Sequence, residues 1–348
     1  MAQLGKITDD FFQKIIKPRL GAKRPEVAVG PEQGVDVGII ELGEYALAMT
    51  ADPVFIVPEY GFERSAWFAI HILASDAATS GLPPAFLSID LNLPPELPDA
   101  DLAAMWEVIH RECEKMGAAI VTGHTGRYDN CHYPMVGGAT FMALGPRDAY
   151  CSPKFCRPGD RIIITKGPAV EATGIFAAMF PGRIENEFGA AVRKQAEDVF
   201  YKMSVVEDAR IAASVGTRDR GVAAMHDATE YGITGGLLEF AKAAGLGLVA
   251  HYDEIVMTPA VAEICRLFEM EPFSSISEGT LIAAVRPHAA GEVLRRLQDR
   301  GILASICGEM TPASDGIHAV IGGKKKPMEH PGEDPFWAAF FRALKERG

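Results

Sequence analysis

Three carboxylates and one histidine lie in stretches of the sequence that are otherwise apolar or rich in small residues. Asp36 begins an apolar strand pattern, Asp52 follows a second one, and Asp76 lies inside an apolar helix pattern. His124 precedes Thr125 between two glycines, after a further apolar run. Carboxylates gathered by such elements suit Mg²⁺, a hard ion that prefers oxygen ligands and keeps phosphate oxygens in its shell. If the fold brings these residues together, the chain can bind a metal ion and a phosphate group.

The helix expected from Ser65 to Ser80 carries the most informative of these acids. Its side chains leave almost no polar face, and Gly81 with the prolines that follow ends it. An ionised Asp76 in that setting needs a cation or several hydrogen-bond donors. A bound metal ion is one solution, and a structural aspartate satisfied by neighbouring hydroxyl or N–H groups is the other. The helix alone does not decide between them.

The second half of the chain offers further phosphate-binding candidates. A strand expected over residues 222–225 leads into a loop from His226 to Gly236, which would bring the second half to the same phosphates. Lys166 stands where a strand pattern enters a helix through glycine. Such a turn can present N–H groups to a phosphate, although a plain short connection has the same pattern.

The elements that must position these residues alternate between strands and helices. Strands are expected over residues 35–40, 45–50, 85–93, 118–122, 134–144, 161–164, 222–225, 279–285 and 303–310, and helices over 100–116, 170–180, 189–214, 287–300 and 335–344. A short helix capped by Thr8 precedes residues 19–34, a segment rich in glycine and proline that is typical of a long loop. This order predicts an α/β or α+β fold.

The chain is long enough for two domains. Its 348 residues allow each domain its own core, and a stretch rich in proline and cysteine over residues 151–159 separates two patterns of elements. We therefore expect an N-terminal segment over residues 1–34, an N-terminal domain over 35–155 and a C-terminal domain over 156–348.

Composition excludes several classes of function. With 46 acidic against 34 basic residues, the net charge of -12 argues against a general nucleic-acid binder. The absence of a long apolar run and of a signal-peptide pattern argues against membrane association, so we expect a cytoplasmic protein. The six cysteines lack CxxC pairing, which suits reduced thiols. A zinc site from Cys151, Cys156 and His132 has irregular spacing and is disfavoured.

Seven stretches, in this order, resemble a known superfamily. They are GVDVGII (34–40), MTADP (49–53), ASDAATSGLPP (74–84), TGHTG (122–126), RPGDRIIITKGPAVEATGI (157–175), MHDATEYGITGGLLE (225–239), and GTLIAAV (279–285) followed by GILASICGEMT (301–311). The superfamily contains aminoimidazole ribonucleotide (AIR) synthetase, the hydrogenase maturation protein HypE, which dehydrates a carbamoyl group, thiamine-monophosphate kinase and selenophosphate synthetase. The sequence is most similar to the HypE branch and to AIR synthase-related proteins.

The resemblance implies a two-domain AIR synthase-like fold. In it, the N-terminal domains of a homodimer form a shared β-barrel, and an αβ C-terminal domain closes over ATP and Mg²⁺. The resemblance implies that Asp36, Asp52 and Asp76 are metal–phosphate ligands, and we expect Asp52 and Asp76 to carry catalysis. The resemblance also implies that the nucleotide contacts His124, Thr125, Asp227, Thr229 and Glu230. We add Lys166 to these residues because it stands in a strand-to-helix turn. The segment before Asp36 resembles a mobile lid.

The sequence also departs from the family pattern at three places. Asp36 stands alone where several members have an aspartate pair, and His124 replaces an aspartate. The family pattern therefore does not fix the number of metal ions or the pH dependence for this chain. The chain ends at Lys345-Glu346-Arg347-Gly348, without the cysteine that carries the carbamoyl group in the hydrogenase branch.

The function expected from these observations is an ATP- and Mg²⁺-dependent enzyme that activates an amide-like or carbonyl oxygen by phosphorylation. Its substrate would be an unknown small molecule or a protein amide. Two alternatives remain open. One is a nucleotide-binding scaffold dimer without turnover, and the other is a kinase of a small metabolite.

Overall fold

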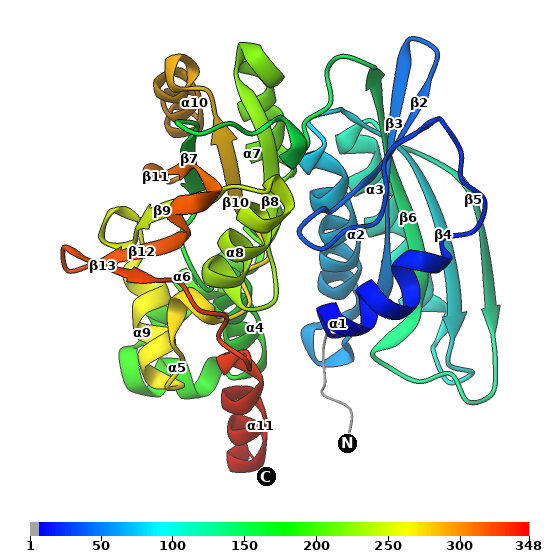
Figure 1. The fold of residues 1–348 in the computed structure, drawn as a ribbon. Helices are drawn as coiled ribbons and strands as arrows, with labels where there is room; N and C mark the ends of the chain where they lie inside the picture. Colours follow the sequence, from blue (N-terminus) through cyan, green and yellow to red (C-terminus); the bar gives the residue numbers. More distant parts are fainter. Residues whose placement is uncertain (1–6, 348) are drawn as a thin grey trace.

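A computed structural model describes residues 7–347 and contains two β-sheets, each packed against helices (Figure 1). Residues 1–6, which open the expected N-terminal segment, and Gly348 lie outside the described residues. The segment at the start of the description holds α1 (Asp9–Phe11), a π-helical turn over Phe12–Ile16 and a 3₁₀ turn over Lys17–Arg19. Thr8 caps α1 as expected, because its side chain accepts a hydrogen bond from the Phe11 amide.

The N-terminal sheet has six strands in the order β1-β2-β3-β6-β4-β5. The strands are β1 (Val27–Val29), β2 (Gly38–Leu42), β3 (Tyr45–Phe55), β4 (Pro84–Leu93), β5 (Ala119–Arg127) and β6 (Met135–Pro146). Only β4 and β5 are parallel. The expected hairpin between residues 35 and 50 is present, since Leu42 pairs with Tyr45. Its second strand continues to Phe55, so Asp52 lies inside β3 and not after it.

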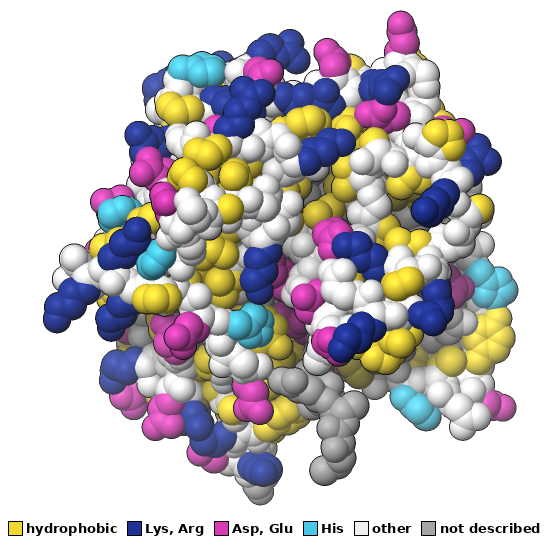
Figure 2. All heavy atoms as spheres, viewed as in Figure 1, with side chains coloured by type: hydrophobic (Ala, Val, Ile, Leu, Met, Phe, Trp, Pro, Cys, Tyr) yellow, Lys and Arg dark blue, Asp and Glu magenta, His cyan; other side chains and the backbone are white. Residues whose placement is uncertain are grey.

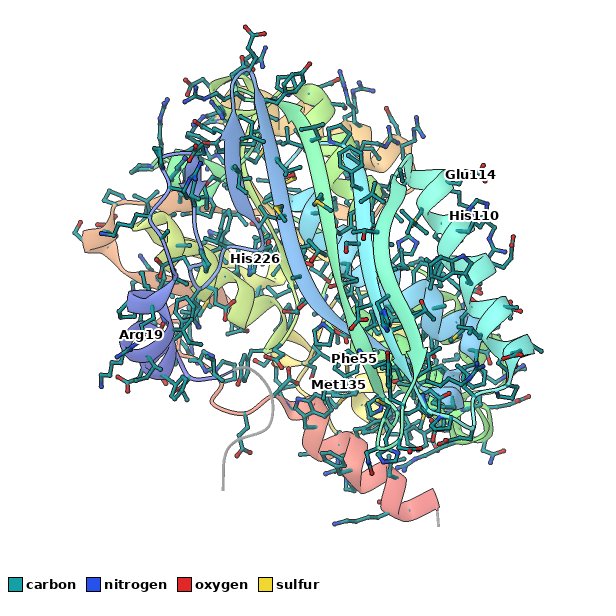
Figure 3. All side chains as sticks on the ribbon, turned by 90° about the vertical axis from the view of Figure 1, so that its right-hand side faces the viewer. Arg19, Phe55, His110, Glu114, Met135 and His226 are labelled. Atoms are coloured by element: carbon teal, nitrogen blue, oxygen red, sulfur yellow. The ribbon has the colours of Figure 1, made fainter. Side chains whose placement is uncertain are left out.

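Two helices cover one face of this sheet. They are α2 (Phe62–Thr79) and α3 (Asp99–Met116). Ile70, Leu73 and Ala74 are fully buried, as the apolar pattern around Asp76 predicts for a helix enclosed on most sides. No helix of residues 7–347 lies in front of the opposite face, which is turned toward the viewer in Figure 3. Within the described residues the sheet of a single chain is open, with β1 and β5 at its edges. The barrel expected to be shared by two chains therefore stays a prediction.

The C-terminal sheet has seven strands in the order β13-β12-β9-β11-β7-β10-β8. The strands are β7 (Arg161–Thr165), β8 (Val222–Ala228), β9 (Gly247–His251), β10 (Thr280–Val285), β11 (Ala304–Thr311), β12 (Ile317–Ile321) and β13 (Lys324–Pro327). The expected β-α-β unit of β10, α10 and β11 is present, but β7 lies between the two strands and pairs with both.

Helices cover both faces of the C-terminal sheet. They are α4 (Val170–Met179), α5 (Pro181–Phe188), α6 (Ala190–Phe200), α7 (Val206–Val215), α8 (Gly232–Ala244), α9 (Pro259–Leu267), α10 (Pro287–Asp299) and α11 (Pro335–Arg347). Successive residues of β7 point to opposite faces of the sheet. Ile162 packs with α8 on one face, and Ile163 packs with α7 and α10 on the other. Helices α4, α9 and α11 share a third apolar cluster. No helix within residues 7–347 is long and apolar enough to cross a membrane.

The structure differs from the local sequence pattern at three elements. The single helix expected over residues 189–214 is two helices, because the chain turns after Phe200 so that Phe200 and Met203 are buried against Phe68 of α2. Residues 324–327 form β13, which pairs with β12 although its side chains are exposed. The expected loop over residues 19–34 contains β1, whose backbone pairs with β2. In each case pairing or packing with distant residues overrides the local pattern.

Helix α2 also contacts the C-terminal half. It packs against α7 and β8. The Ser75 hydroxyl accepts a hydrogen bond of 3.0 Å from the Val205 amide. The two halves therefore meet along the helix that carries Asp76, and Figure 2 shows basic and acidic side chains interspersed over the surface on either side.

Candidate active site

Asp52 and Asp76 lie together beneath the N-terminal sheet. Asp52 pairs with Ala139, which pairs in turn with the buried Ile89, so the Asp52 side chain is on the face covered by α2. The Asp76 carboxyl is hydrogen-bonded to Asp52 and accepts a bond of 2.7 Å from the Thr50 hydroxyl. Burial, together with the charges of nearby aspartates, raises the pKa of Asp76 well above its usual range. Asp76 therefore keeps its proton more readily than an exposed aspartate does.

Asp36 joins this group from the segment before β2 and lies beside the end of β8. Its Oδ1 atom is 2.6 Å from Nδ1 of His226, whose Nε2 is 3.7 Å from a carboxylate oxygen of Glu239. Burial alone would lower the pKa of His226, but the Asp36 and Glu239 carboxylates raise it to about 9. His226 is therefore an imidazolium that offsets part of the negative charge.

Asp227 forms the buried end of the acidic group. It is 1% exposed, and its Oδ2 atom has no hydrogen-bond partner in the structure. Burial and the charge of Asp36 raise the pKa of Asp227 to about 7. Ligand atoms of Asp36, His226 and Asp227 all lie within 4.8 Å of one another, an arrangement that could hold a metal ion.

Two further acids belong to the group and were not found from the sequence. Glu278 precedes β10, and its buried Oε2 atom also has no hydrogen-bond partner. Burial and the charges of Asp227 and Glu171 raise its pKa well above the usual range. Glu171, in the first turn of α4, accepts a bond of 3.1 Å from the Glu278 amide. Burial also raises the pKa of Glu171, to about 8.

The sequence contained one signal for Glu278. It stands beside glycine at the start of a fully apolar strand, the same setting that singled out Asp36. Glu171 offers no such signal, because an acid in the first turn of a helix is ordinary.

These carboxylates fit a divalent cation. They come from separate segments of both halves, and burial together with the charges of neighbouring carboxylates raises the pKa values of Asp76, Asp227 and Glu278. Two of them carry buried oxygens without a hydrogen-bond donor. A hard cation would replace the protons and the imidazolium that now offset this charge.

Comparison with known proteins identifies the family. Residues 34–143 match the model of the AIR synthase related protein, N-terminal domain, and residues 157–321 match that of its C-terminal domain. The chain belongs to the AIR synthase superfamily. The resemblance read from the seven sequence stretches is thereby confirmed.

Relatives within this superfamily are distant in sequence. The chain is 25% identical over 278 residues to carbamoyl dehydratase HypE of Bradyrhizobium diazoefficiens, which covers 76% of this chain and 74% of the relative. It is 24% identical over 346 residues to a putative hydrogenase expression/formation protein of Methanocaldococcus jannaschii, covering 95% and 96%.

Two solved HypE structures share the fold. The Escherichia coli HypE structure superposes with a TM-score of 0.69 at 24% identity, covering 83% of this chain and 87% of that one. A HypE structure in complex with ATP gives a TM-score of 0.67 at 19% identity, covering 94% and 93%. The mixed αβ architecture is thus that of the AIR synthase superfamily.

The other family-derived candidates of the C-terminal half lie in the loop after β8. The Thr229 carbonyl accepts hydrogen bonds from the amides of Gly232 and Ser277. Glu230 is close enough to Glu171 for its charge to raise the pKa of that residue. This loop therefore borders the acidic group.

Lys166 is engaged elsewhere in the C-terminal half. Its ammonium lies 2.6 Å from Oδ1 of Asp208 and 2.8 Å from the Ser204 carbonyl oxygen. This buried ion pair joins the end of β7 to α7. The structure therefore shows Lys166 in a contact between the end of β7 and α7, and its role toward a phosphate stays a prediction.

The structure does not bring His124 and Thr125 to the acids within one chain. His124 pairs with Asp90 on the face opposite to Asp52, and its Nε2 atom lies 2.5 Å from the Tyr128 hydroxyl. Thr125 points to the covered face, but β5 is three strands away from β3, roughly 14 Å. Their place on the nucleotide also stays a prediction.

The cysteines take no part in the acidic group. All six are free thiols, and burial raises the pKa of Cys151 to about 12. Among residues 7–347, the one group of candidate ligands is Asp36, His226 and Asp227. The disfavoured zinc site at Cys151 and Cys156 therefore gains no support.

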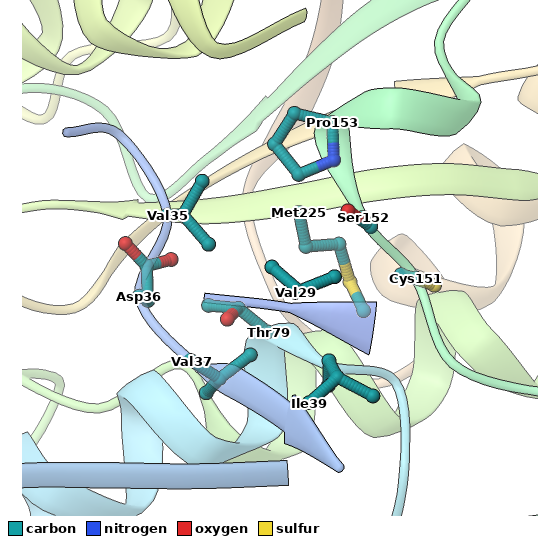
Figure 4. A pocket seen from close by; sticks show the side chains of 10 residues that line it. All are labelled: Val29, Val35, Asp36, Val37, Ile39, Thr79, Cys151, Ser152, Pro153 and Met225. Carbon is teal, nitrogen blue, oxygen red and sulfur yellow. The ribbon is translucent and has the colours of Figure 1, made fainter. Parts of the chain in front are cut away.

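Space beside Asp36 is limited. Figure 4 shows a cavity between Asp36, Thr79 and apolar side chains such as Val35, Val37 and Met225. Its volume of about 10 Å³ holds about one water molecule. A nucleotide cannot occupy this place unless the segment before β2 moves.

Proposed function

We propose that the protein is an ATP- and Mg²⁺-dependent enzyme that activates an amide-like or carbonyl oxygen by phosphorylation. The observation that carries this proposal is the meeting of Asp36, Asp52, Asp76 and Asp227 at the junction of the two halves. Four buried or half-buried carboxylates that repel one another have no evident structural use, and this repulsion contributes to the raised pKa values of Asp76 and Asp227. A site that binds Mg²⁺ and phosphate gives them one.

The residues proposed to hold Mg²⁺ are Asp36, Asp52 and Asp76, with Asp227 facing them from the second half. Bound Mg²⁺ neutralises charge on a transferred phosphoryl group. The chain's own contribution is orientation: Thr50 fixes the Asp76 carboxyl and His226 fixes that of Asp36. Asp52 and Asp76 would carry the phosphoryl-transfer step, with the nucleotide between the proposed domains 35–155 and 156–348.

The segment before Asp36 is proposed to open for the nucleotide. Gly34 has a φ of 75° and packs against the backbone of Glu239 in α8. Gln33 donates a hydrogen bond of 3.4 Å to the Glu239 carboxylate. These few contacts, with the ion pair of Asp36, hold the segment over the acids, as expected for a lid over a closed site.

A homodimer is proposed from the uncovered face of the N-terminal sheet. By strand register, this face presents a row of half-buried apolar side chains: Leu47, Met49, Phe86, Met142 and Leu144. At its lower end in Figure 3, Phe55 and Met135 are exposed. An apolar face of this extent is typical of an interface, and the shared barrel of the superfamily would cover it. Light scattering of wild type and Met142→Glu tests this, since a monomer in both would contradict it.

The HypE relatives support amide activation. Carbamoyl dehydratases are among the similar sequences, and HypE has been solved with ATP and with HypF. We propose a substrate of the same class, a small-molecule or protein amide. A protein partner that presents the amide is part of this proposal.

The test is a phosphorus NMR assay of the protein with ATP, Mg²⁺ and primary amides. Inorganic phosphate released only when amide and Mg²⁺ are both present supports the proposal. A stable phosphorylated product supports a small-metabolite kinase instead. ATP binding without phosphate release supports a scaffold without turnover, a reading that the ion-paired state of Asp36 favours. Failure to bind ATP at all would overturn every reading of the site.

A further inference from the structure

Asp334, immediately before α11, contacts two loops that carry acids of the candidate site. It is 5% exposed. Its Oδ2 atom accepts a hydrogen bond of 2.7 Å from the Tyr231 amide, and its Oδ1 atom accepts one of 2.9 Å from Phe336. A third bond comes from the Ile276 amide. One buried carboxylate thus joins three segments that are distant in sequence.

The two loops that Asp334 joins are those of Glu230 and Glu278. Tyr231 follows Glu230 directly, and Ile276 lies two residues before Glu278. The loops also touch each other, because an added Cβ at Gly232 would lie 2.5 Å from the Ser275 carbonyl oxygen. A shift of either loop would therefore move the carboxylates beside Asp227.

Tyr231 is held in an uncommon backbone conformation. Its φ is 62°, a value that costs energy in residues other than glycine. Its amide is bonded to Asp334 and its ring lies 4.3 Å from the His330 ring, in an edge-on arrangement. Contacts from the C-terminal segment therefore help to maintain this conformation.

Helix α11 gives Asp334 a fixed position. Its residues Phe336, Ala339 and Ala343 are buried in the apolar cluster of α4 and α9. The Phe336 ring lies 5.6 Å from the Phe176 ring of α4. Asp334 is thus held between a packed helix and the two loops.

We propose that Asp334 is a positioning residue for the acidic site, through which the C-terminal helix sets the affinity for the divalent cation. Asp334 acts by fixing the backbone at Tyr231 and Ile276, so that the carboxylates of Glu230 and Glu278 stay at the site. This inference rests on the proposed function, because it assumes that the site binds Mg²⁺ with ATP.

The experiment compares Asp334→Ala and Asp334→Asn with Glu333→Ala, a change at the exposed neighbouring residue. Full-length variants are titrated with Mg²⁺ at saturating ATP, and amide exchange at Tyr231 and Ile276 is measured without ligands. We expect Asp334→Ala to raise the half-saturating Mg²⁺ concentration about tenfold, while phosphate release at saturating Mg²⁺ stays within about twofold. Asp334→Asn keeps one acceptor oxygen, so its half-saturating Mg²⁺ concentration should lie between those of wild type and Asp334→Ala. Glu333→Ala should have the same value as wild type.

Rescue by excess Mg²⁺ separates positioning from a loss of fold, because a misfolded fraction lowers the maximum rate and is not recovered by metal. A wild-type Mg²⁺ dependence in Asp334→Ala overturns the inference. Unchanged exchange at Tyr231 and Ile276 overturns it as well, and that readout needs no nucleotide. If the wild-type protein does not bind ATP, the proposed function is contradicted. The amide exchange at Tyr231 and Ile276 then still tests whether Asp334 fixes the backbone there.

Discussion

His226 and Asp36 are 190 positions apart in the sequence, yet Nδ1 of His226 lies 2.6 Å from Oδ1 of Asp36. This bond joins the end of β8 to the segment before β2, across the junction of the two halves. His226 is labelled behind the N-terminal sheet in Figure 3. The ion pair therefore holds Asp36, a proposed metal ligand, against the second half of the chain.

Replacing His226 with glutamine should destabilise the protein without Mg²⁺. Removal of one partner of a buried ion pair leaves the Asp36 and Glu239 carboxylates uncompensated and costs about 3 kcal/mol. Mg²⁺ should restore part of this loss, so the rise in melting temperature on adding Mg²⁺ should be larger in His226→Gln than in wild type. His110→Gln, at an exposed position of α3, is the control. Equal stability of His226→Gln and wild type would show that the pair is not formed.

Glu171 should make the metal-free protein less stable as the pH rises. Its pKa is about 8 in the fold, against about 4.5 when unfolded, so the folded state keeps a proton that the unfolded state has lost. Stability therefore falls between pH 4.5 and 8. The Glu171→Gln variant has no ionisable group at this position. Its free energy of unfolding at pH 8.5 should therefore exceed that of wild type by on the order of a few kcal/mol.

Urea unfolding at pH 5, 7 and 8.5 measures this effect. Glu187→Gln, at an exposed position of α5, controls for the loss of one negative charge. If the difference in free energy of unfolding between Glu171→Gln and wild type is the same at all three pH values, Glu171 does not have a raised pKa in the fold.

Gly34→Ala should loosen the segment that covers the acids. A Cβ at Gly34 would lie 2.5 Å from the Glu239 carbonyl oxygen, and the residue has a φ of 75°. We expect a loss of about 3 kcal/mol in the free energy of unfolding, from backbone strain and from overlap. Gly43→Ala has a similar φ of 61° but no atom within 4 Å, so it should lose only about 1 kcal/mol. Equal losses in the two variants would mean that the contact with α8 contributes nothing.

Much of the arrangement could be read from local sequence. Asp36, Asp52 and Asp76 were singled out because each is a charge in an otherwise apolar or small-residue element, and Asp227 follows from the family resemblance. The structure places these four residues together. Their role as ligands remains a prediction. The helix around Asp76 and the hairpin before Asp52 also follow from periodicity and turn residues alone.

The remaining features depend on contacts between distant residues. Glu171 lies at an ordinary helix start, and only the packing of α4 beside the loop of Glu278 makes it part of the site. The break after Phe200 arises from burial against α2, which the regular apolar spacing of residues 189–214 does not reveal. Lys324–Pro327 form a strand because β12 offers a pairing edge, although the lysines carry no strand pattern.

Calorimetric titration of ATP into wild type and Asp76→Asn, with and without Mg²⁺, tests the central claim most directly. Asp129→Asn, at an exposed position, is the matched control. We predict that wild type and Asp129→Asn bind ATP only with Mg²⁺, and that Asp76→Asn binds at least about tenfold more weakly. The same variant should be more stable than wild type without Mg²⁺, because one repelling carboxyl is gone. ATP affinity that is unchanged in Asp76→Asn would contradict a metal–nucleotide site at these acids.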